Sequence, residues 1–426
     1  MASFFIPLTG LQSDTTALNT IANNLSNMNT TAYKAQTTNF SDLFYQQIGA
    51  TGAGDPIQVG AGVKVASNET AFTQGSINST GNATDVALNG NGFFVLGNSG
   101  GGTEYSRAGN MSLESNGGLI TSSGLSVMGY PAVNGVVNTN APLTAISIPI
   151  GQVQQPNATS TLNMTANLNA ASATGSTFPA QVTVYDSLGE SHIATVTYTQ
   201  TGVNTWGYSV ALPATDFTSG VSTPVTGTMT FDASGNLASV TPTGGALTPV
   251  GTGTGEMSSI PLSFKGLKDG ASDLSMGWNL LGASGKPSIS QVDTASAVAA
   301  TTQDGYASGQ YQSFTIGSDG TVTATYSNGQ KQNVGQLALA NVANVQGLQM
   351  LGDGDYATTL SSGTAAISTS GTAGLAKLQD GALEASNVNI SAEFSDLIIA
   401  QRAFEANSKT ITTFDTVTQE TINMIH

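Results

Sequence analysis

Apolar side chains recur every seven residues at the beginning of the chain. The repeat consists of Phe4, Leu11, Leu18 and Leu25. Ile21 and Met28 add apolar positions three residues after Leu18 and Leu25. Such a spacing aligns side chains along one stripe of an α-helix, as in a coiled coil. The other positions of this stretch are rich in Asn, Thr, Gln and Ser. The pattern therefore predicts an amphipathic helix at the N-terminal end.

The same period returns at the C-terminal end of the chain. Its positions, and the apolar neighbours that widen the stripe, are Phe394, Leu397, Ile398, Phe404, Ile411, Phe414, Thr418, Ile422 and Ile425. Asn389 or Ser391 is suited to cap the start of this helix, because a short polar side chain accepts hydrogen bonds from the first free backbone N–H groups. Glu393 in the first turn would interact favourably with the helix dipole. We therefore predict a second terminal helix.

Between the two ends the pattern changes to that of β-strands. From residue 84 to 130, apolar and polar positions alternate between Asn-Gly and Gly-Gly breaks, which is typical of hairpins. Further β-rich stretches include residues 178–212 and 313–348, and in the latter Asp319-Gly320 and Asn328-Gly329 predict hairpin turns. Helical periodicity is nearly absent from residue 85 to 375. The fold class expected is mainly β with α-helical termini.

The terminal helices conflict with their own composition. Asn, Thr and Ser lie roughly 0.5–0.7 kcal/mol per residue below Ala in helix propensity, and short isolated helices are marginal. Burying each apolar side chain of a stripe would contribute roughly 1.5–3 kcal/mol. We therefore expect ends that are largely disordered in an isolated chain and ordered when other subunits cover the stripes. Packing of the two helices on each other, or on the β body of the same chain, is the alternative that the pattern leaves open.

Composition and charge narrow the class of protein and its partners. The 426 residues predict two to four domains, and a hydrophobic fraction of 39% is too high for a disordered chain. Ten Lys and Arg against 26 Asp and Glu give a net charge of -16. Because few cations are left to neutralise phosphates, we expect no nucleic acid and no anionic membrane as a partner. The lack of cysteine excludes disulfides and thiolate metal sites.

Export and membrane signals are weak in this sequence. The start, "MASFFIPLTG", lacks a basic region and its apolar run is broken by Pro7, so it is a poor secretory signal. No apolar run approaches the roughly 20 residues that a membrane span needs. We therefore expect neither a cleaved signal peptide nor a membrane-spanning helix.

Histidine, the commonest catalytic base and metal ligand, is scarce in this chain. The two histidines are His192, inside a predicted strand, and His426, the last residue. We interpret them as a surface strand position and a frayed terminus, so that a His-based triad or metal cluster is not expected.

Three short motifs have the composition of functional loops but favour turns. "GDGDY" (352–356) lacks the further spaced acids of a calcium loop and predicts a polar turn. Gly90-x-Gly92 lacks the third Gly of a phosphate-binding loop, so a tight β-turn is expected. Asp186 and Glu190 in "VYDSLGE" could form a carboxylate pair, but the Asp-Ser-Leu-Gly sequence between the strands favours a hairpin turn. We therefore expect no catalytic residue, no cofactor and no metal ion.

Long motifs at both ends and in the middle resemble the bacterial flagellar rod and hook protein family. They are "LNTIANNLSNMNTTAYKAQTTNF" (18–40, with the pair Tyr33 and Lys34), "DVALNGNGFFVL", "YSRAGNMSLESNGGLI" and "MGYP" between residues 85 and 131, and "GALEASNVNISAEFSDLIIAQRAFEANSKTI" (381–411). Residues 184–210 and 302–330 are similar to the hook branch of this family. Val342 and Val345 depart from it, because members often have Phe and Pro there. Stretches 132–175 and 211–300 match weakly.

The resemblance implies a nested multidomain architecture. A terminal helical assembly domain, a connecting segment, an inner β domain and an inserted outer β domain would comprise residues 1–33 with 385–426, 34–75, 76–148 with 301–384, and 149–300, respectively. In this arrangement coiled-coil helices line a narrow tube and the β domains form its outer shells.

The resemblance also implies a function that is structural rather than enzymatic. Copies of the chain would self-assemble into the hook, a curved tube that acts as a flexible universal joint and transmits motor torque from rod to filament. Adjacent subunits would be held together by Leu11, Leu18, Ile21, Leu25, Met28, Leu397, Phe404, Ile411, Phe414 and Ile422. A distal rod protein and a secreted β-rich adhesin or polysaccharide-active enzyme are the alternatives.

Partners and location follow from the same resemblance. Other copies of the chain are the first partner, and the distal rod, the hook cap, the hook–filament junction protein and the flagellar type III export apparatus are the others. The chain would be extracellular, in the flagellum, after export as an unfolded chain without a cleaved signal peptide.

Overall fold

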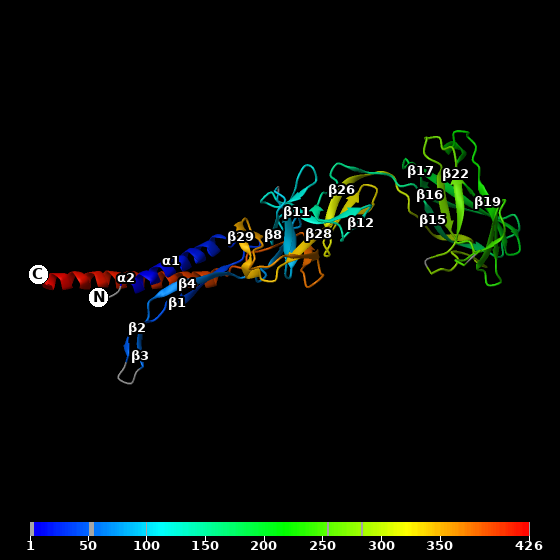
Figure 1. Cartoon of the computed structure of the whole chain (residues 1–426). Helices are drawn as coiled ribbons and strands as arrows, with labels where there is room; N and C mark the ends of the chain where they lie inside the picture. Colours follow the sequence, from blue (N-terminus) through cyan, green and yellow to red (C-terminus); the bar gives the residue numbers. More distant parts are fainter. Residues whose placement is uncertain (1–3, 51–54, 99, 254, 283, 426) are drawn as a thin grey trace. The chain divides into compact units, whose positions relative to one another are not determined.

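The computed structural model describes residues 4–50, 55–98, 100–253, 255–282 and 284–425. His426 lies outside these residues, so its expected frayed position stays a prediction. The chain divides into two compact units, coloured along the sequence in Figure 1. The first unit comprises Met1–Ile150, Ser313–Thr325 and Lys331–His426, and the second comprises Gly151–Gln312 and Tyr326–Gln330. The second unit is therefore an insertion into the first.

A long α-helix is present at each end of the chain, as the apolar periodicity predicts. Helix α1 spans Phe5–Ser26 and helix α2 spans Ile390–Ile425. The cap of α2 is Asn389, whose Oδ1 accepts hydrogen bonds from the backbone N–H groups of Ser391 at 3.1 Å and Ala392 at 3.3 Å. The two helices lie side by side in the first unit (Figure 1).

The segment after α1 forms two separate two-stranded antiparallel sheets. Strand β1 (Gln36–Asp42) pairs with β4 (Val63–Thr70), and β2 (Gln46–Ala50) pairs with β3 (Pro56–Val59). Both β1 and β4 contact α1, so this hairpin gives the helix a second packing partner besides α2.

The β body of the first unit is built around one antiparallel path of strands, β27-β28-β11-β7-β8-β30-β29. These strands are, in the same order, Thr321–Tyr326, Lys331–Asn341, Ser126–Val133, Phe93–Gly97, Thr103–Ser106, Asp355–Ala357 and Gln349–Gly352. Two smaller ladders pair β5 with β33 and β6 with β32, which span Ile77–Ser79, Ala382–Glu384, Val86–Asn89 and Lys377–Asp380. An aromatic cluster of Phe72, Phe93 and Tyr356 fills one part of this body.

The second unit contains a six-stranded and a five-stranded sheet. The first follows the order β16-β17-β18-β19-β20-β21, with strands Thr177–Tyr185, Ser191–Gly202, Thr205–Ala211, Val225–Phe231, Leu237–Pro242 and Thr248–Pro249. The second follows β22-β23-β15-β24 with β25 also on β15, and its strands are Ser259–Phe264, Leu274–Asn279, Thr161–Asn169, Ile289–Val292 and Ala297–Gln303. Residues of both sheets share one buried core that includes Trp206, Tyr208 and Trp278.

Four of the turns expected from the sequence are confirmed, and Gly90-x-Gly92 forms a bend between β6 and β7. Gly320 and Gly329 have left-handed φ angles of 86° and 78°, and they lie before β27 and before β28. The "GDGDY" motif forms the turn between β29 and β30, and "DSLG" forms the turn between β16 and β17. In the described part of residues 85–375, the only helices are two short 3-10 helices, η1 (Ala214–Asp216) and η2 (Val345–Gly347). This agrees with the expected lack of helical periodicity.

The expectation that His192 takes a surface strand position is wrong. The residue does lie in a strand, β17, but its side chain is only 5% exposed. Successive residues of a strand point to opposite faces. In β17 the buried face carries Ala194, Val196 and Tyr198, and His192 belongs to the same parity.

A buried ion cluster ties both terminal helices to the β body. The Nζ of Lys34, which follows α1, lies 2.6 Å from Oε1 of Glu384, which precedes α2. The other carboxylate oxygen of Glu384 lies 3.0 Å from Nη2 of Arg107, which follows β8. All three side chains are buried, and burial lowers the pKa of the Lys34 ammonium group. We call Lys34, Arg107 and Glu384 the root cluster.

Replacing Glu384 by Gln should destabilise the first unit by about 3–5 kcal/mol, because it leaves two buried cations without a counter-charge. The measurement is urea unfolding followed by the far-UV signal of α1 and α2. The matched control is Glu405→Gln, which removes the same charge from a pair with Arg402 whose side chains are 78% and 64% exposed. The control should cost less than about 1 kcal/mol. Equal costs for both variants would contradict the role of the root cluster.

Replacing Leu162 by Ala should destabilise the second unit alone, by about 2–5 kcal/mol, because Leu162 is completely buried in its core. Both Trp residues of the chain, Trp206 and Trp278, lie in that core, so tryptophan fluorescence reports its unfolding. The helical signal at 222 nm reports the first unit. Leu247→Ala is the control, because Leu247 is 65% exposed. A parallel shift of both signals would show that the units unfold together.

Candidate assembly interface

Small and polar residues take part in the contact between α1 and α2. The side chain of Asn407 lies against Gly10, where an added Cβ would be only 2.6 Å from Nδ2 of Asn407. The same Nδ2 donates a hydrogen bond to Oδ2 of Asp14 at 2.8 Å. Nearer the β body, Nδ2 of Asn24 donates to Oε1 of Glu393 at 3.0 Å. The helices are therefore joined by specific polar contacts along this line.

The buried side of α1 differs from the apolar stripe that the sequence predicts. Its buried residues are Pro7, Gly10, Ser13, Thr20 and Asn24. The predicted interface residues Leu11, Leu18, Ile21 and Leu25 are half-buried, and Met28 is 40% exposed. The apolar stripe of α1 is thus only partly covered within the chain.

On α2 the predicted interface residues fall into two groups. Leu397, Ile411 and Phe414 are half-buried, and the ring of Phe414 meets that of Phe4 edge to face at 5.9 Å. Phe404 and Ile422 are exposed, at 37% and 53%. The structure therefore gives some of the stripe a partner within the chain and leaves the rest uncovered.

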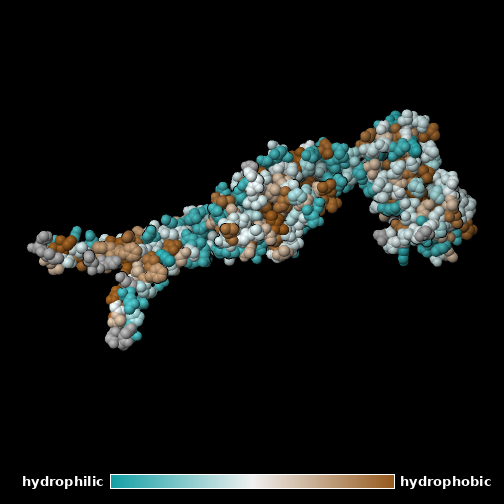
Figure 2. Space-filling view, in the orientation of Figure 1, coloured by the Kyte–Doolittle hydropathy of each residue, from teal (hydrophilic) through white to brown (hydrophobic). Residues whose placement is uncertain are grey.

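Further large apolar side chains are exposed on both helices. They are Phe5, Ile6, Leu8, Phe394, Ile398, Ile399, Val417 and Met424. Figure 2 shows hydrophobic surface along the helical end of the first unit. Exposed apolar surface of this extent is typical of a site of interaction. Sequence reasoning had placed Ile398 and Phe394 on the stripe, but had not singled out Phe5, Leu8 or Ile399.

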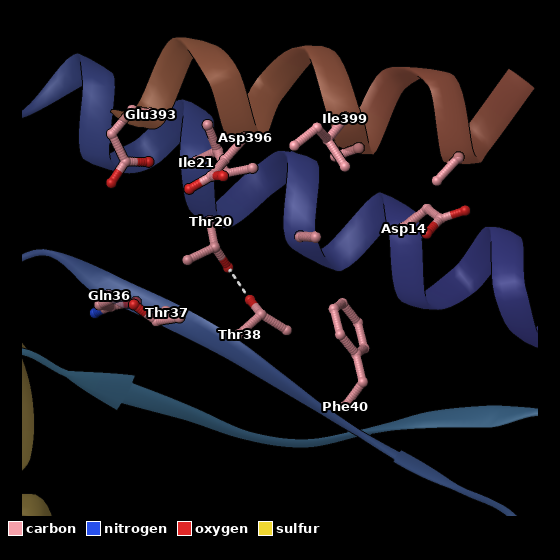
Figure 3. A pocket seen from close by; sticks show the side chains of 13 residues that line it. Asp14, Thr20, Ile21, Gln36, Thr37, Thr38, Phe40, Glu393, Asp396 and Ile399 are labelled. Carbon is pink, nitrogen blue, oxygen red and sulfur yellow. Dashed lines mark hydrogen bonds between the residues drawn. The ribbon is translucent and has the colours of Figure 1, made fainter. Parts of the chain in front are cut away.

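A groove with a volume of about 370 Å³ lies between α1, α2 and β1 (Figure 3). Its apolar lining includes Ile21, Phe40 and Ile399. The hydrogen bond at 2.9 Å between Oγ1 of Thr38 and Oγ1 of Thr20 connects β1 to α1 along its floor. Partial burial raises the pKa of Glu393 at its margin. The groove combines apolar side chains with acidic ones, among them Asp14 and Asp396, next to the helix pair.

Asparagine side chains position the helices, a role that sequence reasoning missed. Asn24 accepts hydrogen bonds from the backbone N–H of Gln36 at 3.0 Å and from the hydroxyl of Tyr33 at 3.1 Å. Asn387 accepts from the N–H of Ala35 at 2.8 Å and donates to the carbonyl of Ala71 at 2.7 Å. Asparagine can replace backbone partners in this way. The Asn-rich composition that weakens α1 therefore also supplies its attachment.

In the part of the chain that the structure describes, no helix combines the length and the apolarity that a membrane crossing requires.

Four family models match successive parts of the chain. They are described as Flagella basal body rod protein (residues 8–34), Flagellar hook protein FlgE/F/G D1 domain (87–167), Flagellar basal body protein FlaE D2 domain (155–306) and Flagellar basal body rod FlgEFG protein C-terminal (379–424). The D1 and D2 models overlap at residues 155–167, shortly after the chain passes from the first unit to the second at Gly151.

Curated relatives match the chain from end to end. The flagellar hook protein FlgE of Treponema pallidum (strain Nichols) is 37% identical, with 100% of this chain and 99% of the relative covered. FlgE of Escherichia coli (strain K12) is 35% identical over 99% of this chain and 100% of the relative. FlgE of Borreliella burgdorferi is 32% identical over 100% and 99%.

A solved structure supports the fold. The crystal structure of the Helicobacter pylori flagellar hook protein FlgE2 superposes with a TM-score of 0.55 at 14% sequence identity and covers 72% of this chain and 100% of that chain. The terminal motifs, the inserted second unit and the full-length relatives agree, and the chain belongs to the flagellar hook protein family.

Proposed function

We propose that copies of this hook subunit assemble through the apolar surfaces that α1 and α2 leave uncovered within one chain. The observation that carries this proposal is that each helix uses one set of residues for the contact within the chain and leaves a different, apolar set exposed. Their mutual contact includes Gly10, Asp14, Asn24 and Asn407, while Phe and Ile side chains such as Ile398 remain in contact with solvent. A helix pair that packed only for its own stability would bury those side chains instead.

The free energies favour assembly coupled to helix ordering. Fixing the backbone costs roughly 1–2 kcal/mol per residue, and α1 is rich in weak helix formers. Covering each exposed Phe, Leu or Ile would contribute roughly 1.5–3 kcal/mol. Because these side chains are exposed in one copy, that contribution becomes available only when neighbouring copies pack against the helices.

The β units are suited to the outer part of a flexible tube. The chain has only 8% charged residues. In the described part of the second unit, the Lys–carboxylate pair Lys265–Asp273 is long, at 4.0 Å, and solvent-exposed. When the surfaces of neighbouring subunits carry mainly short polar side chains, few strong ion pairs have to break as one subunit slides along the next. A hook built in this way would bend while transmitting torque.

Other partners are proposed from the family. The distal rod, the hook cap and the hook–filament junction protein would contact the ends of the polymer, and the flagellar type III exporter would deliver the chain outside the cell. The low helix propensity of α1 is compatible with passage as an unfolded chain. The end-to-end match to hook proteins favours this function over a distal rod protein or an adhesin.

Replacing Ile398 by Glu should abolish tube formation without unfolding the subunit, because Ile398 is 58% exposed in the single chain and would be buried between copies. Electron microscopy and sedimentation at high protein concentration measure the polymer, and tryptophan fluorescence checks the fold. Gln401→Glu adds the same charge at an exposed polar position of α2 and is the control. Tubes from Ile398→Glu at the control's yield would exclude this face as an interface.

Deleting residues 1–30 together with 390–426 should also abolish polymerisation, because it removes both helices. The thermal transition of the second unit, followed by its two Trp residues, should stay unchanged. The full-length chain, run in parallel, should form curved tubes. If both proteins stay monomeric over all concentrations and salts tested, the helices serve the single chain and the proposed interface is wrong.

A further inference from the structure

Four titratable side chains meet in the second unit, far from the helices in sequence. Asp186 lies in the turn between β16 and β17, His192 lies in β17, Asp216 ends η1, and Asp269 lies in the loop between β22 and β23. Three separate loops and one strand therefore bring them together. We call these residues the His192 cluster.

The histidine is held by carboxylates on both ring nitrogens. Its Nδ1 lies 2.8 Å from Oδ2 of Asp216, and its Nε2 lies 3.3 Å from Oδ2 of Asp186. A carboxylate on one ring nitrogen fixes the proton there and directs the other nitrogen toward a metal in many metalloproteins. If Nδ1–H donates to Asp216, the lone pair of Nε2 faces an oxygen of Asp186. A positive species is then needed between them.

The other oxygen of Asp186 is already committed to the turn. Its Oδ1 accepts hydrogen bonds from the backbone N–H groups of Leu188 at 2.8 Å and Glu190 at 2.9 Å. The side chain is completely buried, so Oδ2 has a fixed position. Asp186 therefore presents a single, immobile oxygen to the cluster.

A second carboxylate faces the same point. The ligand atoms of Asp186, His192 and Asp269 all lie within 4.8 Å of one another. Two carboxylates this close repel each other when both are ionised, unless a proton or a cation lies between them.

The distance between His192 and Asp186 fits a small cation. Zinc bonds to nitrogen and oxygen ligands are about 2.0–2.1 Å long, so neighbouring ligands of a tetrahedral site lie about 3.3 Å apart. The 3.3 Å between Nε2 of His192 and Oδ2 of Asp186 equals that spacing. Asp269 is exposed and can adjust its side chain to complete a third bond.

An ion can reach the cluster from solvent. A cavity of about 400 Å³ is lined by His192, Asp216 and Asp269, among others. The side of the cluster that faces this cavity leaves room for a water molecule as a fourth ligand. Imidazole together with carboxylate ligands suits zinc and similar transition-metal ions better than Ca²⁺ or Mg²⁺, which prefer oxygen alone.

We propose that Asp186, His192 and Asp269 bind one divalent transition-metal cation, with Asp216 as the positioning residue that orients the imidazole. The bound cation joins the β16–β17 turn to the loop between β22 and β23. It thus cross-links two segments of the second unit in a chain that has no cysteine. Sequence reasoning missed this site, because Asp269 is remote in sequence and His192 was placed on the surface.

The test is zinc binding by the full-length chain after treatment with EDTA, measured by calorimetry and by metal analysis after dialysis. We expect one equivalent of Zn²⁺, and a higher thermal transition of the tryptophan fluorescence when it is bound. His192→Gln and Asp269→Asn should each weaken binding at least tenfold. Asp273→Asn, a carboxylate of the same loop outside the cluster, and His426→Gln should bind as the wild type does.

A fourth variant separates the metal ligand from the turn. Asp186→Asn keeps the Oδ1 acceptor that the turn needs and replaces only Oδ2, so it should fold and lose zinc. Asp232→Asn is its control, because Oδ1 of Asp232 accepts two backbone N–H groups in the same way, from Ser234 and Asn236 at 2.8 Å each. The absence of saturable binding, or equal binding by wild type and His192→Gln, would show that a proton alone bridges the cluster and would overturn the proposal. Neither outcome bears on hook assembly.

Discussion

The root cluster is the constraint on which the arrangement of the first unit depends. Lys34 and Glu384 are 350 positions apart in sequence, and Arg107 comes from the β body between them. Burying charges is costly unless they are paired, so none of the three side chains can occupy its place alone. The two ends of the chain and the β body must therefore come together at once. The end of α1 and the start of α2 are thereby attached to the β body, although α1 has a low helix propensity.

The polar contacts along the helices also join parts of the chain that are far apart in sequence. Asn24 and Asn387 satisfy backbone groups at the junction, and Asn407 joins α2 to Asp14 of α1. Such contacts fix geometry but bury little apolar surface. The apolar side chains are left for neighbouring subunits, which is what a subunit needs if its ends are to be completed only in the polymer.

The second unit is stabilised in a different way from the first. Its stability rests on an apolar core that contains both Trp residues and is shared by two sheets. The second unit carries few charges, and the partly buried His192 cluster is the exception, because it concentrates three carboxylates around one imidazole. A unit with its own core can be inserted into the first unit without relying on the terminal helices.

The sequence by itself determined the terminal helices and the Gly-containing turns, and it narrowed the α2 cap to Asn389 or Ser391, because periodicity and turn chemistry act between near neighbours. Its long motifs also identified the family. Only the tertiary structure decided which side of α1 is buried, that Lys34 meets Glu384, and that His192 points inward. Strand parity with Val196 could have placed His192 correctly. The other two contacts join residues hundreds of positions apart, and no local pattern encodes such pairings.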